Sequence, residues 1–245
     1  MSDLRATIIG LLGFAAAEER MLLAASADGE PGDPGCWAAV PVVAHNTEFK
    51  HQQVQRLDAI LANDVPPESG DIDHTSDEVY RAYAALPREQ VARDNSRVSA
   101  QLIDGVTAVS DDDLRDPARN PWLRGRQLWL QIVVRGFWHP TGHIGGYYLE
   151  HAQPERAVAL AEHGVATASY LGAADPARGM ACYNLACAQA RAERADDAAA
   201  ALREAIELNP DVRANAARDT DLAILRSSGR LEAVHADQMT GPDGR

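Results

Sequence analysis

The chain has 245 residues and a formal net charge of −13, and its hydrophobic content of 46% includes only 5% aromatic residues. Nucleic acids and anionic membrane surfaces attract clustered Lys and Arg, so this acidity argues against both as partners. Alanine supplies much of the apolar content and is the best helix former, which predicts an all-α protein of closely packed helices.

Four long helices are predicted in the first 152 residues. Apolar residues recur with a helical period over 4–25, and a second helix is expected over 37–62 after a loop rich in Gly and Pro. A third is expected over 75–103, where hydroxyl and acidic residues suit its start. The fourth covers 122–152. Together these segments predict a four-helix bundle.

Two prolines fall inside this helical pattern. Pro87 predicts a kink in the third helix, because proline removes a backbone hydrogen bond and clashes with the preceding turn. Pro140 predicts a bend in the fourth helix between His139 and His143. A bend at that point re-aims the backbone beside two side chains that can carry chemistry, although tight packing against a neighbour is an equal cause.

The remaining residues, 153–245, are predicted to form short alanine-rich helical hairpins. The best pattern there has the spacing of a tetratricopeptide helix pair, in which small residues let two antiparallel helices approach closely. One good copy and one looser copy fall short of the roughly three units that a free-standing solenoid needs. We therefore expect these hairpins to pack on the bundle. The residues of the better copy are Leu185, Ala186, Ala198, Leu202, Ala205 and Pro210.

Three histidines are the strongest candidates for chemistry. His139 and His143 are four residues apart, so they share one face of a helix, and His45 lies in the predicted second helix. Three imidazoles with open positions are typical of a catalytic metal, and they suit Zn²⁺, Ni²⁺, Fe²⁺ or Cu²⁺. The alternative is structural: His139 packs beside the bend while His45 is a hydrogen-bonded core residue. Glu48, one turn after His45, is interpreted first as a surface glutamate, and a fourth ligand or a general base is the alternative.

The three cysteines predict no disulfide framework. Cys36, Cys182 and Cys187 form no CxxC pair, and their odd number leaves one over. This favours a reducing compartment. The chain begins without a signal-peptide pattern, and no apolar stretch approaches the roughly 20 residues of a membrane span. We expect a cytoplasmic protein.

The histidine pattern, with one His on the second helix and HxxxH on the fourth, resembles the DinB/YfiT-like superfamily. In detail, AHNTEFKHQQVQRL and FWHPTGHIGGYYLEH are similar to its ClbS/DfsB-type branch, over about residues 1–152. The resemblance implies a helical bundle, often dimeric, with a divalent metal held by His45, His139 and His143. Known members include thiol-dependent enzymes that use mycothiol, bacillithiol or glutathione. One departure is that Pro140 and Gly142 fall between the paired histidines.

Two functions follow as expectations. The first is a metal-dependent thiol S-transferase or related hydrolase that acts on a small electrophilic molecule, with Zn²⁺ or Ni²⁺ bound and a low-molecular-weight thiol as cosubstrate. We expect this enzyme to be a homodimer. The second is a non-catalytic module whose tetratricopeptide-like tail binds a protein partner in a groove on residues 153–225. The histidine pair favours the enzyme, since a binding module has no need of it.

Overall fold

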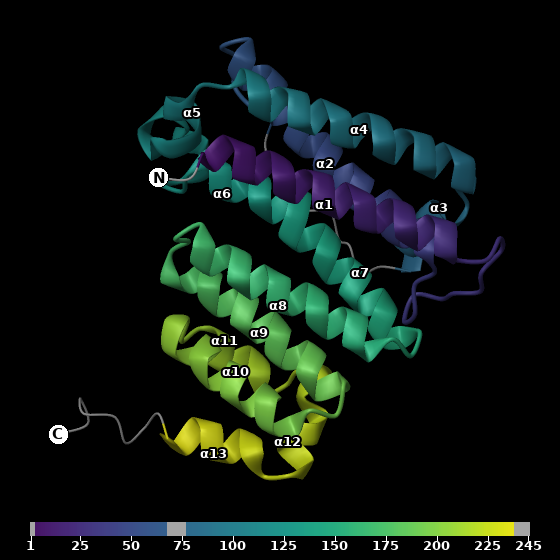
Figure 1. Cartoon of the computed structure of the whole chain (residues 1–245), viewed down its shortest axis with the longest axis vertical. Helices are drawn as coiled ribbons and strands as arrows, with labels where there is room; N and C mark the ends of the chain where they lie inside the picture. The colour runs from purple at the N-terminus through teal and green to yellow at the C-terminus, as the bar shows by residue number, and fades with distance from the viewer. Residues whose placement is uncertain (1–2, 68–76, 238–245) are drawn as a thin grey trace. The chain divides into compact units, whose positions relative to one another are not determined.

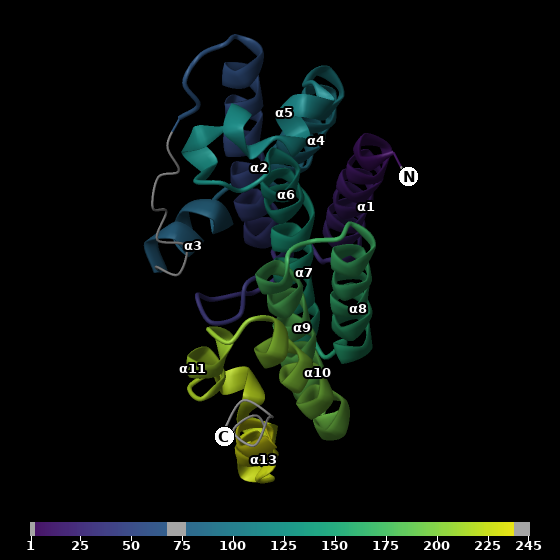
Figure 2. The same ribbon diagram turned by 90° about the vertical axis from the view of Figure 1, so that its left-hand side faces the viewer.

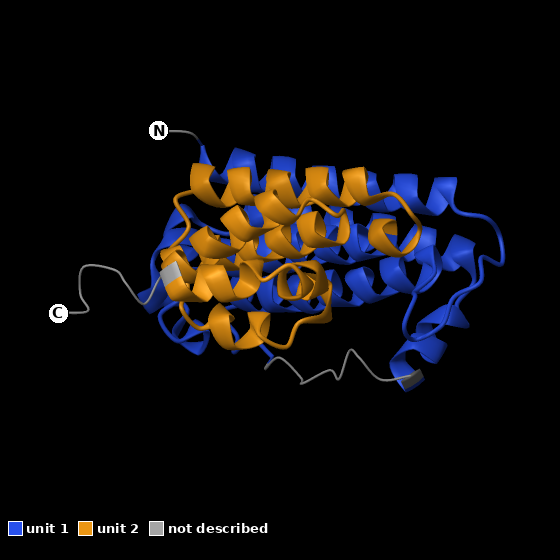
Figure 3. Ribbon diagram, turned by 90° about the horizontal axis from the view of Figure 1, so that it is seen from below, with its two compact units in different colours: residues 1–147 blue, residues 148–245 orange. Residues whose placement is uncertain are grey.

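The computed structural model describes residues 3–67 and 77–237, and the regular elements in this part of the chain are all helices (Figure 1). An isolated bridge joins Asp33 to Cys36, and no strand forms within the described ranges. The all-α class expected from the composition is confirmed. The chain divides into two compact units, residues 1–147 and 148–245, which are coloured separately in Figure 3.

Unit 1 (residues 1–147) is built around α1, α2, α4 and a continuous segment from α6 to α7, which run alongside one another (Figure 1, Figure 2). α4 packs on both α1 and α2, and the π-helical turn η3 packs on the same two helices. The elements that begin in unit 1 are α1 (Leu4–Ala25), α2 (Ala39–Leu61), α3 (Asp77–Ala84), α4 (Arg88–Ala108), α5 (Asp111–Arg115), η1 (Pro117–Arg119), η2 (Pro121–Leu123), α6 (Leu128–Val133), η3 (Val134–Trp138) and α7 (His139–Glu150).

α1 shows how a local signal sets a helix in place. The side chain of Asp3 accepts a hydrogen bond from the Ala6 backbone N–H at 3.2 Å, which satisfies one of the free donors of the first turn. Beyond this cap, the apolar positions of the pattern face the core, and Ile8 and Leu12 are among the buried residues. The predicted range 4–25 is therefore the observed one.

The third predicted helix is two helices, so the expected kink at Pro87 is wrong. α3 ends at Ala84, and α4 begins at Arg88 after Pro87, which has an extended backbone with φ −64° and ψ 134°. Proline offers no N–H to the preceding turn and disfavours helical geometry in the residue before it. Both effects end α3 here. The predicted start at residues 75–76 lies outside the described residues, and α4 continues to Ala108 rather than to residue 103.

The fourth predicted helix begins later than expected. Residues 117–123 form two short 3₁₀ turns, and α6 starts only at Leu128. Between the second turn and α6, Arg124 has a φ of 53° and Gly125 has a φ of 84°. This left-handed backbone is incompatible with a continuing right-handed helix. The helical segment then runs through η3 into α7 and ends at Glu150, close to the predicted residue 152.

Unit 2 (residues 148–245) consists of short helices, as the alanine-rich pattern predicts. α8 packs on α9, and α9 packs closely on α10. Ala186 of α9 and Ala198, Leu202 and Ala205 of α10 are fully buried in its core. α10 ends just before Asn209 and Pro210. The elements are α8 (Pro154–Tyr170), α9 (Asp175–Arg191), α10 (Ala195–Leu208), α11 (Val212–Ala216), η4 (Thr220–Leu222), α12 (Ala223–Ser227) and α13 (Arg230–Asp237).

The close approach of α9 to the end of α10 requires a glycine. A Cβ at Gly179 would lie 2.6 Å from Cβ of Asn209, 2.9 Å from its backbone N and 3.0 Å from the Ala205 carbonyl oxygen. Two of these three atoms belong to the backbone and cannot rotate away. We expect Gly179→Ala to lower the free energy of unfolding by about 1–3 kcal/mol, the usual cost of overpacking. Urea denaturation followed by circular dichroism measures this change.

Gly146→Ala is the matched control for that substitution. Gly146 also lies inside a helix, α7, but an added Cβ meets nothing within 4 Å. Because alanine favours the helix over glycine, this variant should be unchanged or more stable by about 0.5–1 kcal/mol. Equal effects of the two substitutions would contradict the packing explanation.

None of the helices within residues 3–67 and 77–237 has both the length and the apolar character needed to cross a bilayer.

Candidate metal centre

The three predicted histidines come together in unit 1. His45 projects from α2, and His139 and His143 project from the first turns of α7, one turn apart on the same face. Nε2 of His45 lies 3.1 Å from Nε2 of His139 and 3.1 Å from Nε2 of His143. His45 is fully buried, while the other two are partly exposed. The structure therefore joins residues that are almost a hundred positions apart.

The spacing of the three nitrogens suits one shared ion. Zn–N bonds are about 2.0–2.1 Å long, so two nitrogens at tetrahedral positions lie about 3.3 Å apart. An imidazole nitrogen carries either one proton or one in-plane lone pair, so Nε2 of His45 cannot make two linear hydrogen bonds to its neighbours. A cation that accepts all three lone pairs satisfies this arrangement better than hydrogen bonds do. The donor set therefore fits a divalent metal.

Aromatic side chains fix the histidine rings. Phe49, one turn after His45 on α2, stacks on His139 with ring centroids 3.9 Å apart and an interplanar angle of 23°. Trp37 and Tyr83 meet the His45 ring nearly edge to face, at centroid distances of 5.5 and 5.9 Å. These rings exclude water from that side of the cluster, which strengthens electrostatic interactions there.

The backbone before the histidine pair is wound as a π turn. The N–H of His139 bonds to the Val134 carbonyl oxygen, five residues back, instead of four. This adds one residue to the turn, and the next residue, Pro140, has no N–H to restore the regular pattern. The Thr141 hydroxyl donates to the Phe137 carbonyl oxygen at 2.8 Å. The predicted irregularity is present, but it precedes the pair, and α7 continues through Pro140 and Gly142.

Asn46 ties the two ligand-bearing helices together. Its side-chain Nδ2 donates to the Pro140 carbonyl oxygen at 3.4 Å, and the residue is fully buried. Because Asn46 follows His45 on α2 and Pro140 follows His139 on α7, this contact sets the distance between the ligands. In the sequence, the signal for this role is limited to the position of Asn46 next to a candidate ligand.

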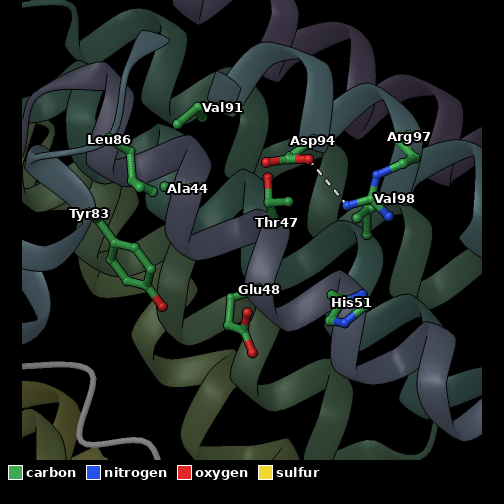
Figure 4. Close-up of a pocket in the computed structure, with 10 residues that line it drawn as sticks. All are labelled: Ala44, Thr47, Glu48, His51, Tyr83, Leu86, Val91, Asp94, Arg97 and Val98. Carbon is green, nitrogen blue, oxygen red and sulfur yellow. Dashed lines mark hydrogen bonds and ion pairs between the residues drawn. The ribbon is translucent and has the colours of Figure 1, made fainter. Parts of the chain in front are cut away.

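Glu48 does not join the three histidines. The group of possible metal ligands within the described residues contains His45, His139 and His143 without it. Glu48 instead lines a cleft of about 190 Å³ between α2, α3 and α4, together with His51 and Tyr83 (Figure 4). Burial, followed by the charge of Glu48, raises the pKa of Tyr83 above its ordinary value, so Tyr83 remains a phenol at neutral pH.

A buried ion pair lies in the core of unit 1, and the sequence reasoning missed it. Nζ of Lys50 on α2 is 2.5 Å from Oε2 of Glu19 on α1 and 3.0 Å from the Ser99 hydroxyl on α4, and it also donates to Asn95. The Thr47 hydroxyl reaches the same Asn95 oxygen at 3.2 Å. The signal in the sequence is that Glu19 stands at a position where the helical period of α1 predicts a buried apolar residue.

A second group of potential ligands occurs in unit 2, where Cys187, Asp219 and Asp221 lie close together. The hydrogen bonds that Asp219 accepts here are those of a residue that caps the start of a helix. Oδ1 of Asp219 accepts from the Asp221 backbone N–H at 3.0 Å, and Oδ2 accepts from the Tyr183 hydroxyl at 2.6 Å. Arg191 lies 3.5 Å from Asp221. The cluster is therefore explained by the start of η4.

The cysteines of unit 2 should react slowly with thiol reagents. Burial raises the pKa of Cys182 to about 11, and burial with the charge of Asp219 raises the pKa of Cys187 well above its ordinary range. The thiolate is the reactive form, and near neutral pH little of it is present at either residue. We expect iodoacetamide to label the partly exposed Cys36 first, as measured by peptide mass spectrometry. Equal labelling rates at all three would contradict this order.

No family model, curated protein or solved structure compared with this chain matches it significantly.

Proposed function

We propose that this protein is a metal-dependent enzyme in which His45, His139 and His143 hold one divalent ion, with Zn²⁺ and Ni²⁺ as the first candidates. The observation that carries the proposal is the 3.1 Å separation of Nε2 of His45 from each of the other two Nε2 atoms. Three protein ligands leave at least one coordination position open. An open position is the mark of a catalytic rather than a structural metal.

When bound, the ion supplies a Lewis acid that lowers the pKa of a thiol or water, so that a nucleophile exists near neutral pH. The chain's own contribution is to fix the ligands and limit water. Phe49 holds the His139 ring by stacking, and Trp37 covers the His45 ring. Asn46 sets the spacing between α2 and α7 through the Pro140 carbonyl. Together these contacts preorganise the three donors before an ion binds.

We further propose a thiol S-transferase, or a related hydrolase, that acts on a small electrophilic molecule with a low-molecular-weight thiol as cosubstrate. The resemblance of the histidine segments to the DinB/YfiT-like superfamily supports this reaction class. A second support is that Cys182 and Cys187 are kept in the protonated thiol form, so neither provides a thiolate near neutral pH. A thiol from a cosubstrate fills that role.

The test is a transfer assay with protein loaded with Zn²⁺ or Ni²⁺. The chromogenic electrophile 1-chloro-2,4-dinitrobenzene is offered with glutathione, mycothiol or bacillithiol, and product is followed by absorbance. We expect turnover that needs both the ion and one of the thiols and that is lost in His143→Ala. His151→Ala, which changes a histidine outside the ligand group, should retain it.

The hydrolase variant of the proposal predicts a different pattern. Consumption of a reactive ester should then depend on the ion but not on added thiol, and His143→Ala should still abolish it. If the metal-loaded protein accelerates neither thiol transfer nor ester hydrolysis above the rate of the free ion, the proposed reaction classes are wrong. Metal binding itself is tested by a different measurement, the metal content of the protein.

A further inference from the structure

The cleft between α2, α3 and α4 is a second place where unit 1 can bind a small molecule. Its volume of about 190 Å³ is below the roughly 300–1,000 Å³ of drug-sized sites, so its ligand has few heavy atoms. None of the three histidine ligands lines it. The side chains around it are Ala44, Thr47, Glu48, His51, Tyr83, Leu86, Val91, Asp94, Arg97 and Val98 (Figure 4).

The charge balance of this cleft favours a cation. Arg97 is already engaged, because it donates to Asp94 at 3.2 Å and to Gln101 at 3.0 Å. Glu48 is partly buried and accepts a long hydrogen bond of 3.3 Å from Gln52. Within the described residues no Lys or Arg forms an ion pair with Glu48. Its carboxylate is therefore the uncompensated charge of the cleft.

The remaining walls suit the organic part of such a cation. Tyr83 lies on one side of Glu48 in the close-up, and aromatic rings attract organic cations (Figure 4). Leu86, Val91 and Val98 give the cleft an apolar side that accepts a short hydrocarbon chain.

The wall on α2 is held rigidly. The Thr47 hydroxyl bonds to the Val43 carbonyl oxygen at 2.7 Å and to Asn95 at 3.2 Å, and Asn95 in turn bonds to Lys50. The positive charge of Lys50 behind this wall is neutralised by Glu19 at 2.5 Å. The cleft therefore keeps its shape and its negative charge without a ligand, and a preformed site loses less entropy on binding.

We infer that this cleft binds a small primary amine, with its ammonium group at Glu48 beside Tyr83 and its hydrocarbon chain on Leu86, Val91 and Val98. The inference does not depend on a bound ion: Tyr83 contacts both the cleft and the His45 ring, but none of the three histidine ligands lines the cleft. It assigns Glu48 a recognition role in place of the ligand or base role considered from the sequence.

The experiment is a titration of the protein with n-butylammonium and with n-butanol, which has similar size but no charge. Binding is followed by isothermal titration calorimetry and by the NMR signals of Tyr83 and Thr47. We expect the ammonium to bind at least about tenfold more tightly than the alcohol, the usual advantage of a charge-assisted hydrogen bond. Equal affinity for the two probes, or no binding of the ammonium, overturns the inference.

Variants locate the site and separate it from the metal. Glu48→Gln should weaken ammonium binding by about tenfold or more, whereas Glu89→Gln, an exposed glutamate on α4 outside the cleft, should leave it unchanged. His139→Ala protein should bind the ammonium as wild type does. Unchanged affinity in Glu48→Gln overturns the inference. If Glu48→Gln fails to fold, the wild-type preference for ammonium over alcohol and the Tyr83 signal decide the question.

Discussion

Replacing Lys50 with methionine is expected to lower the free energy of unfolding by about 3–5 kcal/mol, the cost of leaving a buried charge without its partner. Nζ of Lys50 is the cation beside Glu19, whose side chain is fully buried in the core of unit 1. Without it, Glu19 must stay ionised in a low-dielectric interior or take up a proton. Urea denaturation near neutral pH, followed by circular dichroism, gives the change directly.

Two further variants test the reason for this loss. The double replacement Glu19→Leu with Lys50→Met should recover much of the stability, because an apolar pair of similar volume often replaces a buried ion pair at little cost. Arg178→Met, which breaks an exposed pair with Asp175, should cost less than about 1 kcal/mol. A Lys50→Met effect as small as that of Arg178→Met would contradict the assignment of a buried ion pair.

Zinc is expected to stabilise the folded protein through the three histidines. An ion that binds only the native state adds about 2.7 kcal/mol of stability when its free concentration is about 100 times Kd. His143→Ala removes one of the three donors and should lose most of this gain, while the folded protein itself survives because His143 is partly exposed. Thermal denaturation with Zn²⁺ and with a chelator measures the difference.

The matched control for this substitution is His151→Ala, which removes an imidazole outside the ligand group. It should keep the full response to zinc. A similar zinc-dependent rise in Tm for wild type and His143→Ala would place the bound zinc elsewhere, on surface carboxylates for example.

The sequence predicted the elements with local signals. α1 was located by its apolar period, and the Asp3 cap that the structure adds also involves only neighbouring residues. The break at Pro87 was misjudged as a kink, because local pattern does not decide whether tertiary packing holds a proline-bent helix together. The π turn before His139 could not be predicted, since an extra residue in a turn leaves the side-chain pattern almost unchanged.

The candidate metal centre was predictable for a different reason. His139 and His143 share a helix face by spacing alone, and the histidine pattern as a whole singled out His45 as their partner. The contacts of Lys50 with Glu19 and Asn95 join three helices, so no local pattern contains them. The superfamily, the homodimer, the thiol, the cytoplasmic location and a protein partner for the tail stay predictions.

Metal content is the most direct test of the central claim. The protein is purified without an affinity tag, and its metal is measured by elemental analysis for wild type and for His139→Ala. We expect about one Zn²⁺ or Ni²⁺ per chain in the wild type, as for a three-histidine site, and none in the variant. A wild-type protein that is free of metal and stays so after Zn²⁺ and Ni²⁺ are added would contradict the proposed metal centre.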